Sequence, residues 1–323
     1  MNDTDMKRKE TAVPCPWSDL SDDERYMRRC LQLAAQGRLN AKPNPMVGAV
    51  IVADGRIIGE GYHVRCGEGH AEVNAFASVR REDEALLPQS TIYVSLEPCS
   101  HYGKTPPCAD LIVRKGVRRC VVGCIDPFAE VQGRGVAKLR AAGIEVTVGV
   151  LEAECKELNK CFFTFHREHR PYIILKWAQT ADGYIDNHFQ PLAVSTPFTR
   201  MLVHQLRSQV DAIVVGRVTD EREHPRLDVR YWSGRNPLRL VVDRHHPLQM
   251  ESLYAQHVQS LLVEGGRQAL LSFLDAGLWD ELRVETASMT VGGGTSAPPI
   301  PAGALVHRVE DYDGNRIIHY RRG

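Results

Sequence analysis

Apolar runs of strand length alternate with segments of helical periodicity along most of the chain, and this alternation is the feature that most limits the fold. Strands are expected over residues 91–96, 119–125 and 144–150, with helices beginning near His70 and Cys108 and a third over 132–142. A strand followed by a helix and another strand forms a parallel pair with the helix packed on one face. The sequence therefore predicts an α/β protein with largely parallel sheets covered on both faces.

The segment before the first of these strands is expected to add a helix and a hairpin. Ser21 followed by Glu24 matches a capping box, and apolar residues then recur at helical spacing. Further on, the apolar run 47–52, the Asp54-Gly55 turn and the run 57–62 predict two antiparallel strands.

A second α/β unit is expected after a linker-like stretch at 166–171. Its strands are expected at 172–177, 212–216, 238–243, 260–263 and 281–286, and its helices at 197–210 and 267–276. With 323 residues the chain is long enough for two domains of ordinary size. We therefore predict a flexible arm at 1–20, a first domain at 21–165 and a second domain at 172–323, with no element assigned in the Gly- and Pro-rich tail after Gly292.

Charge and composition exclude several classes of protein. Forty basic residues balance forty acidic ones, which argues against a broadly basic nucleic-acid binder, because phosphate affinity depends on clustered Lys and Arg. No apolar run approaches the roughly 18 residues of a membrane span, and the polar start lacks the apolar core of a secretory signal. Nine cysteines, an odd number, suggest reduced thiols. We expect a cytoplasmic protein without nucleic-acid or membrane partners.

The strongest chemical signal is a His-x-Glu motif at His70 and Glu72, followed by Cys99 of a Pro-Cys pair and by Cys108. One imidazole and two thiolates supply three ligands to a tetrahedral zinc ion and leave the fourth position open for water, as in catalytic zinc sites. A carboxylate at Glu72 is suited to carry a proton from that water to a leaving amine. This combination is the signature of zinc nucleobase deaminases.

Three alternatives compete with a small-molecule deaminase. The zinc could be structural, with Cys66 or His101 as a fourth ligand, or the chain could be a non-catalytic zinc protein that binds a metabolite or partner. Glu72 argues against both, because a structural site does not need a carboxylate beside His70. A nucleic-acid-editing deaminase would need a basic, aromatic face, whereas net charge is zero and aromatic residues make up 7%.

Around these residues the sequence resembles the deaminase half of the bifunctional riboflavin-biosynthesis deaminase–reductases. The resemblance is carried by the segments KPNPMVGAVIV, GYH, GHAEVNAF and VSLEPCSHYGKTPPCADLI. The long loop between Cys99 and Cys108 is typical of this family, whereas most cytidine and transfer-RNA deaminases place their two cysteines only two residues apart. The resemblance implies a cytidine-deaminase-like three-layer domain.

The same resemblance implies a substrate and its contacts. The substrate would be a diaminopyrimidinone that carries a ribosylamino 5′-phosphate, and its ring 2-amino group would be hydrolysed to a carbonyl. Asn44 and His63 would help hold the ring or the ribose, and Lys104, in the loop 101–105, would help hold the phosphate. A turn-forming role for Asn44 and a solvated charge at Lys104 are equal alternatives.

The second half resembles the reductase half of the same family. The segments PYIILKWAQTADGYI, DAIVVGRVT, HPRLDVR, NPLRLVVD and LLVEGG occur in the family's order. The resemblance implies a dihydrofolate-reductase-like α/β domain that reduces the ribose of the deaminated product to ribityl with NADPH. Residues that would face the cofactor are Ala178, Thr219, Gly266, Arg267, Gln268, Ala269 and Leu270. Residues that would face the substrate are Arg207, Leu227, Arg230 and Glu264, with both arginines pairing with its phosphate.

Taken without the resemblance, the second half is less informative. The glycines before residue 267 could approach a phosphate at a helix N-terminus or could simply form a strand-to-helix turn, and no GxGxxG fingerprint is present. Asp182 would lie near the reacting ribose or act only as a turn residue. The family usually has an acidic residue or Asn where this chain has His224, and the segment after Thr286 also departs from the common pattern.

We expect zinc and NADPH as cofactors and a homo-oligomer.

Overall fold

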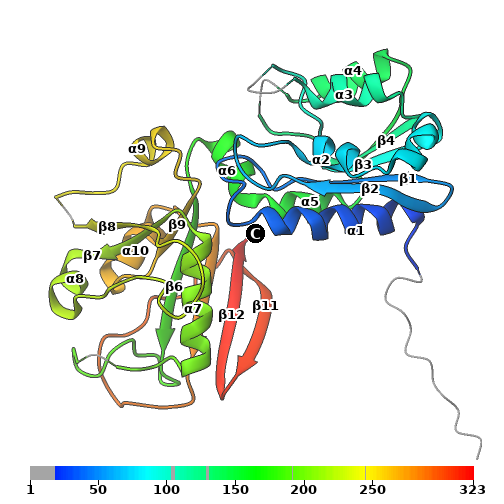
Figure 1. Cartoon of the computed structure of the whole chain (residues 1–323). Coiled ribbons are helices and arrows are strands. Elements are labelled where there is room, and N and C mark those ends of the chain that lie inside the picture. Colours follow the sequence, from blue (N-terminus) through cyan, green and yellow to red (C-terminus); the bar gives the residue numbers. More distant parts are fainter. Residues whose placement is uncertain (1–18, 103–105, 129–130, 191, 244) are drawn as a thin grey trace, which may run out of the picture.

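The computed structural model describes residues 19–102, 106–128, 131–190, 192–243 and 245–323, which form two α/β domains (Figure 1). The arm expected at 1–20 lies almost entirely outside these ranges. The helices and strands of the first domain are α1 (Asp22–Ala34), β1 (Gly48–Ala53), β2 (Arg56–Tyr62), α2 (Ala71–Ala77), β3 (Thr91–Leu96), α3 (Cys108–Lys115), β4 (Arg119–Cys124), α4 (Arg134–Ala141), β5 (Glu145–Val148), α5 (Glu152–Leu158) and α6 (Lys160–Glu168), with 3₁₀ turns at Ala35–Gly37 and Arg81–Gln89.

The first domain is built on a five-stranded sheet in the order β2-β1-β3-β4-β5. Strand β1 is antiparallel to β2 and to β3, as the expected hairpin requires, whereas β3, β4 and β5 are parallel. The capping box is also present: the Glu24 backbone N–H donates to Ser21 Oγ, and the Glu24 carboxylate accepts from the Ser21 backbone N–H at 2.8 Å. The capping box and the hairpin are confirmed, but the expected largely parallel sheet is a mixed one, in which two of the four strand pairs are antiparallel.

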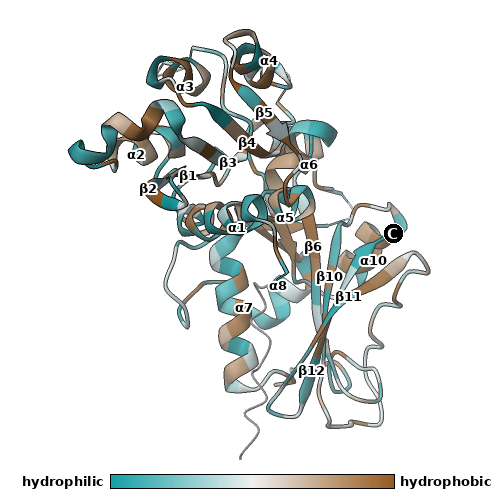
Figure 2. Cartoon of the chain, turned by 90° about the vertical axis from the view of Figure 1, so that its right-hand side faces the viewer, coloured by the Kyte–Doolittle hydropathy of each residue, from teal (hydrophilic) through white to brown (hydrophobic). Residues whose placement is uncertain are grey.

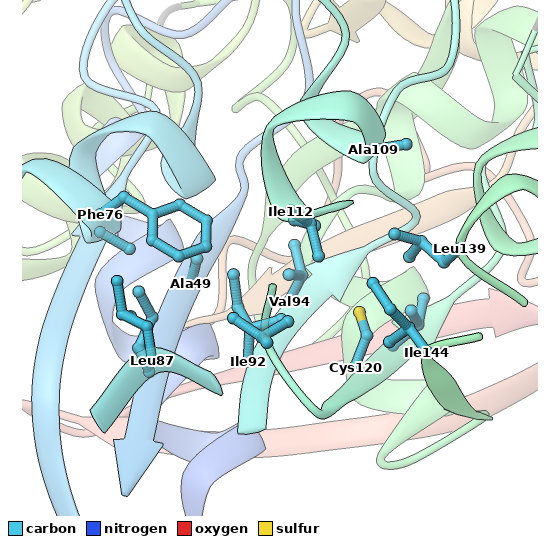
Figure 3. Packing of buried hydrophobic residues seen from close by; sticks show 14 of the residues in the cluster. Ala49, Phe76, Leu87, Ile92, Val94, Ala109, Ile112, Cys120, Leu139 and Ile144 are labelled. Atoms are coloured by element: carbon cyan, nitrogen blue, oxygen red, sulfur yellow. The ribbon is translucent and has the colours of Figure 1, made fainter. Parts of the chain in front are cut away.

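Helices cover both faces of this sheet, because its inner strands β1, β3 and β4 are buried at nearly every position on both faces. Strand β3 sends Ile92 and Val94 to one face and Tyr93 to the other, as the two-residue repeat of a strand requires. The first face packs against α2, α3 and α4 through residues such as Phe76 and Ile112 (Figure 3). The opposite face packs against α1, α5 and α6. The result is a three-layer domain.

The second domain contains a seven-stranded sheet in the order β11-β12-β10-β6-β9-β7-β8. Its elements are β6 (Tyr172–Gln179), α7 (Pro197–Gln209), β7 (Ala212–Gly216), α8 (Arg217–Glu223), β8 (Leu238–Val242), α9 (Met250–Ala255), β9 (Ser260–Val263), α10 (Arg267–Asp275), β10 (Glu281–Thr286), β11 (Ala304–Tyr312) and β12 (Asn315–Arg322). The five strands from β10 to β8 in this order are parallel. Their carboxyl ends therefore share one edge, where α/β proteins bind ligands.

The C-terminal hairpin was not expected from the sequence. Strands β11 and β12 are antiparallel, and Tyr312 pairs with Asn315 across a two-residue turn. Asp313 and Gly314 both have positive φ, 51° and 82°, as a type I′ turn requires. The Asp-Gly pair was a usable signal. It was missed because β11 lies at the sheet edge and is exposed along most of its length, so it lacks an apolar alternation.

The expected linker at 166–171 is partly wrong, because residues 166–168 belong to α6. The reason is burial: Phe162 and Phe163 pack in the core of the first domain, Phe165 packs against Tyr254 of the second domain, and these contacts extend the helix to Glu168. Helix α6 lies at the junction of the two sheets in both views (Figures 1 and 2). Only three residues, 169–171, separate α6 from β6.

Ion pairs hold the two domains together at this junction. Lys42 donates to Asp211 at 2.9 Å, and Lys160 donates to Glu281 at 2.6 Å. Each pair joins a lysine of the first domain to a carboxylate of the second. The deaminase-like and reductase-like halves therefore meet along a defined contact surface.

Candidate active sites

Three predicted metal ligands converge at the start of two helices on one face of the first sheet. His70 immediately precedes α2, Cys108 is the first residue of α3, and Cys99 follows β3. His70 Nδ1 lies 3.5 Å from Cys99 Sγ and 3.3 Å from Cys108 Sγ. Among the described residues, these three form the one group with ligand atoms within 4.8 Å of one another, so neither Cys66 nor His101 joins it.

The chemistry of this donor set fits zinc. Hydrogen bonds from Cys108 and His70 lower the pKa of the Cys99 thiol to about 4, while the hydrogen bond to Cys99 and burial raise the pKa of Cys108. A cluster that already stabilises one thiolate is prepared for a divalent cation. One histidine and two cysteines leave a fourth position of a tetrahedral ion free.

Glu72 lies in the first turn of α2 with 3% of its surface exposed. Burial and the neighbouring Cys99 raise the pKa of its carboxyl to about 7. A carboxyl with a pKa near neutrality can both accept and donate a proton at the pH of the cell. Its position beside the metal ligands is the one expected of a proton shuttle.

Asn44 and His63 lie together in the wall of the same cavity. His63 Nδ1 is 3.1 Å from the carbonyl oxygen of Gly69, and His63 Nε2 is 3.1 Å from Asn44 Nδ2. When Nδ1 donates to that carbonyl, Nε2 accepts from the amide. Asn44 also forms a turn through its backbone N–H to Ala41, so the site and turn interpretations are compatible. Lys104 lies outside the described residues.

The cavity around the metal ligands has a volume of about 480 Å³ and contains residues that sequence reasoning missed. Asp126, after β4, is buried, and burial raises its pKa to about 7. His166, His257 and Gln259 line the cavity as well, the last two from the second domain. No local motif marks these residues, and His257 and Gln259 reach the cavity only through the packing of the two domains.

In the second domain, the residues predicted to face the cofactor gather at the carboxyl edge of the parallel sheet. The Gly266 backbone N–H donates to Thr219 Oγ1 at 3.2 Å, and a Cβ atom on Gly266 would lie 2.5 Å from that oxygen. At Gly265 a Cβ would lie 2.5 Å from the Gly216 nitrogen. Arg267 Nε is buried without a partner among the described residues. This cradle fits an anionic group of a nucleotide near the start of α10.

The other cofactor-facing candidates lie beside this cradle. Ala178 is near the end of β6 and pairs with Glu285 of β10. Gln268, Ala269 and Leu270 form the first turn of α10, and Ala269 and Leu270 are buried against the sheet.

The predicted substrate-facing residues of the second domain fall into two groups. Arg207 and Glu264, with side chains 12% and 6% exposed, form a bidentate ion pair at 2.8 and 2.7 Å, and Arg207 also donates to the Asp228 carbonyl. Arg230 is exposed, pairs with Asp228 and lies 5.0 Å from the Tyr231 ring. Of the two arginines, Arg230 has the guanidinium that is accessible to a ligand.

Three further residues that the sequence singled out have structural roles of their own. Leu227 has a positive φ of 53°, and its side chain packs in a core cluster of the second domain. Asp182 accepts from Thr180 and from the backbone N–H groups of Val291 and Gly292. His224 ends α8 in the left-handed conformation.

The fold and the two sites define a zinc-binding deaminase domain joined to a nucleotide-binding reductase domain. Residues 20–124 match the family described as the cytidine and deoxycytidylate deaminase zinc-binding region, and residues 171–251 and 245–312 match the RibD C-terminal domain. The chain belongs to the RibD family of bifunctional deaminase–reductases of riboflavin biosynthesis.

Individual relatives support this assignment over nearly the whole chain. The riboflavin biosynthesis protein RibD of Aquifex aeolicus is 36% identical, over 93% of this chain and 98% of its own length. RibD of Escherichia coli is 36% identical over 84% of this chain and 89% of its own. A crystal structure of a diaminohydroxyphosphoribosylaminopyrimidine deaminase/5-amino-6-(5-phosphoribosylamino)uracil reductase from Thermotoga maritima has 34% identity, covers 93% of this chain and 99% of its own, and superposes with a TM-score of 0.84.

These comparisons confirm the resemblance, the α/β fold of both domains and the pairing of a deaminase with a reductase. The editing-deaminase and non-catalytic alternatives are therefore wrong. Within the described ranges, none of the helices combines the length and apolar content that a membrane crossing needs.

Proposed function

We propose that this chain hydrolyses the ring 2-amino group of a 2,5-diamino-6-ribosylaminopyrimidinone 5′-phosphate and then reduces the ribosyl side chain of the product to ribityl with NADPH. The observation that carries the first step is the convergence of His70, Cys99 and Cys108 beside the buried Glu72. The Thermotoga maritima protein, whose name states both a deaminase and a reductase activity, supports the substrate class.

In the deaminase, His70, Cys99 and Cys108 would hold zinc, which would supply a water molecule acidic enough to react at neutral pH. Glu72 removes a proton as the water oxygen adds to the ring carbon, and it returns a proton to the departing amine. The C–N bond breaks, ammonia leaves and a carbonyl remains. The carboxyl pKa of about 7 suits both transfers.

Next to this centre, His63 and Asn44 orient the substrate. Their hydrogen bond and the contact of His63 with Gly69 fix the imidazole at the cavity wall. Asn44 retains acceptor and donor capacity for a ring or ribose group. Lys104, predicted to bind the phosphate, stays a prediction.

In the reductase, NADPH would bind at the carboxyl edge and supply hydride to the ribose. Thr219, Gly266, Arg267 and the first turn of α10 would hold its phosphates, and Ala178 would lie against it. Support comes from the glycine cradle and from the buried Arg267 Nε, which has no partner in the described part of the chain. The accessible Arg230 would bind the substrate phosphate, and Arg207 would act by fixing Glu264.

We also infer a homo-oligomer that forms through β11. This edge strand exposes Leu305, Val306 and Val309, each between 49% and 61%, and exposed apolar edges are normally covered. Val306→Lys should shift the protein toward monomer in sedimentation velocity, and an unchanged sedimentation coefficient would contradict this interface. A reducing compartment such as the cytoplasm suits the ligand thiols.

The proposed order of reactions has a direct test. The purified zinc-loaded chain is incubated with the diaminopyrimidinone phosphate, first alone and then with NADPH. Ammonia should appear without NADPH, and NADPH oxidation should follow only once deaminated product has accumulated. Ammonia release from cytidine or RNA, with none from this substrate, would contradict the proposed function.

A further inference from the structure

The cavity that contains the metal ligands is not built by the deaminase domain alone. His257 and Gln259, from the segment between α9 and β9, line it together with first-domain residues. The cavity is too large for a pyrimidine ring alone, and a substrate with its reacting carbon at the metal must extend toward other walls. The domain junction is therefore part of the deaminase site.

The segment between α9 and β9 is hydrogen-bonded to the first domain beside this cavity. Gln259 is buried and its side chain donates to the Pro43 carbonyl at 2.7 Å, one residue before Asn44. Its backbone N–H donates to Asp211, which also binds Lys42 of the first domain. These contacts tie the segment to the loop that carries Asn44.

The charges around the cavity are not distributed evenly. Glu68 and Glu72 flank His70, and Glu97 and Asp126 follow the adjacent strands β3 and β4, so none of the four carboxylates that line the cavity comes from α6 or from the second domain. A dianion would be repelled by these groups. It would be accommodated better along the walls formed by α6 and by the second domain.

Imidazoles and aromatic rings form that side of the cavity. The His166 ring lies 4.4 Å from Phe162 and 5.3 Å from Phe165, and Phe165 in turn lies 6.3 Å from His257. His257 is exposed at the mouth and has a left-handed backbone, with φ of 58°. Burial and the charges of His169 and His257 lower the pKa of His166. Neutral imidazoles still donate an N–H, and a bound phosphate favours their protonated form.

We propose that His257 of the reductase domain and His166 of α6 bind the 5′-phosphate of the deaminase substrate, so that the second domain completes the first active site. This inference rests on the proposed function for the identity of the substrate. On this proposal the second domain helps to bind the substrate of the deamination step.

The test compares wild type with His257→Asn, which tolerates the left-handed backbone. The matched control is His169→Asn, because His169 is also left-handed and exposed but does not line the cavity. Deaminase KM and kcat are measured on the phosphorylated substrate and on its dephosphorylated form. His257→Asn should raise KM for the phosphorylated substrate about tenfold or more, the loss of one charge-assisted hydrogen bond, with kcat and the dephosphorylated substrate unaffected.

Equal effects on both substrates, or the same effect in His169→Asn, would overturn the proposal. Calorimetric titration with ribose 5-phosphate, carried out on both proteins with Arg230→Ala added to remove the proposed reductase phosphate site, separates it from the proposed function. If the wild-type chain released no ammonia from the diaminopyrimidinone phosphate, the proposed function would be contradicted. Weaker ribose 5-phosphate binding in His257→Asn would still support the phosphate site, and equal binding in both proteins would overturn it.

Discussion

Replacing Glu72 by glutamine should reduce deamination by about 10²- to 10⁴-fold, the usual contribution of a general acid–base group. The amide keeps the shape of the side chain but cannot take up the proton that must move from water to the leaving amine. Glu72 is not one of the three clustered ligands, so bound zinc, measured by elemental analysis, should remain at one ion per chain. NADPH oxidation with deaminated substrate should be unchanged.

Glu68→Gln is the matched control. Glu68 lines the same cavity two residues before His70, but it is exposed and lies 3.8 Å from Arg65. Its substitution should leave deamination close to wild type. A Glu72→Gln variant that loses zinc would show that this carboxyl holds the metal site together, and one that deaminates normally would eliminate it as the proton shuttle.

The deaminase domain was the more predictable half, for two physical reasons. Its inner strands are apolar on both faces, so β3 could be placed at residues 91–96 from the sequence alone. Zinc chemistry restricts ligands to a few residue types, so His70, Cys99 and Cys108 could be grouped although 38 positions separate the first from the last. Local patterns suffice where each residue's environment is decided by its own element.

Prediction was weaker where contacts between elements decide the outcome. Strand β11 has no apolar alternation, because its place at the sheet edge leaves both of its faces largely exposed. His257 reaches the deaminase cavity only because the domains pack through Lys42 and Asp211. Arg207 was expected to bind phosphate, and no sequence pattern revealed that Glu264 lies within hydrogen-bond distance of it.

This ion pair is the basis of the second large effect. Arg207→Met should destabilise the reductase domain by about 3–5 kcal/mol, because the Glu264 carboxylate, only 6% exposed, would stay buried without its partner. Burial raises the pKa of Glu264, but the hydrogen bond from Arg207 and the charge of Lys176 outweigh it and keep the pKa below its usual value. The stabilisation is therefore complete above about pH 4.5 and is lost as pH falls through the lowered pKa.

Urea unfolding of the full chain measures this effect. Trp177, Trp232 and Trp279 all lie in the second domain, so tryptophan fluorescence reports mainly on the reductase. Arg230→Ala is the comparison: its guanidinium is exposed, so the midpoint of unfolding should hardly move, while KM for the deaminated substrate should rise. If Arg207→Met instead unfolds like wild type and raises only KM, Arg207 binds the substrate phosphate directly and the ion pair with Glu264 is not what stabilises the domain.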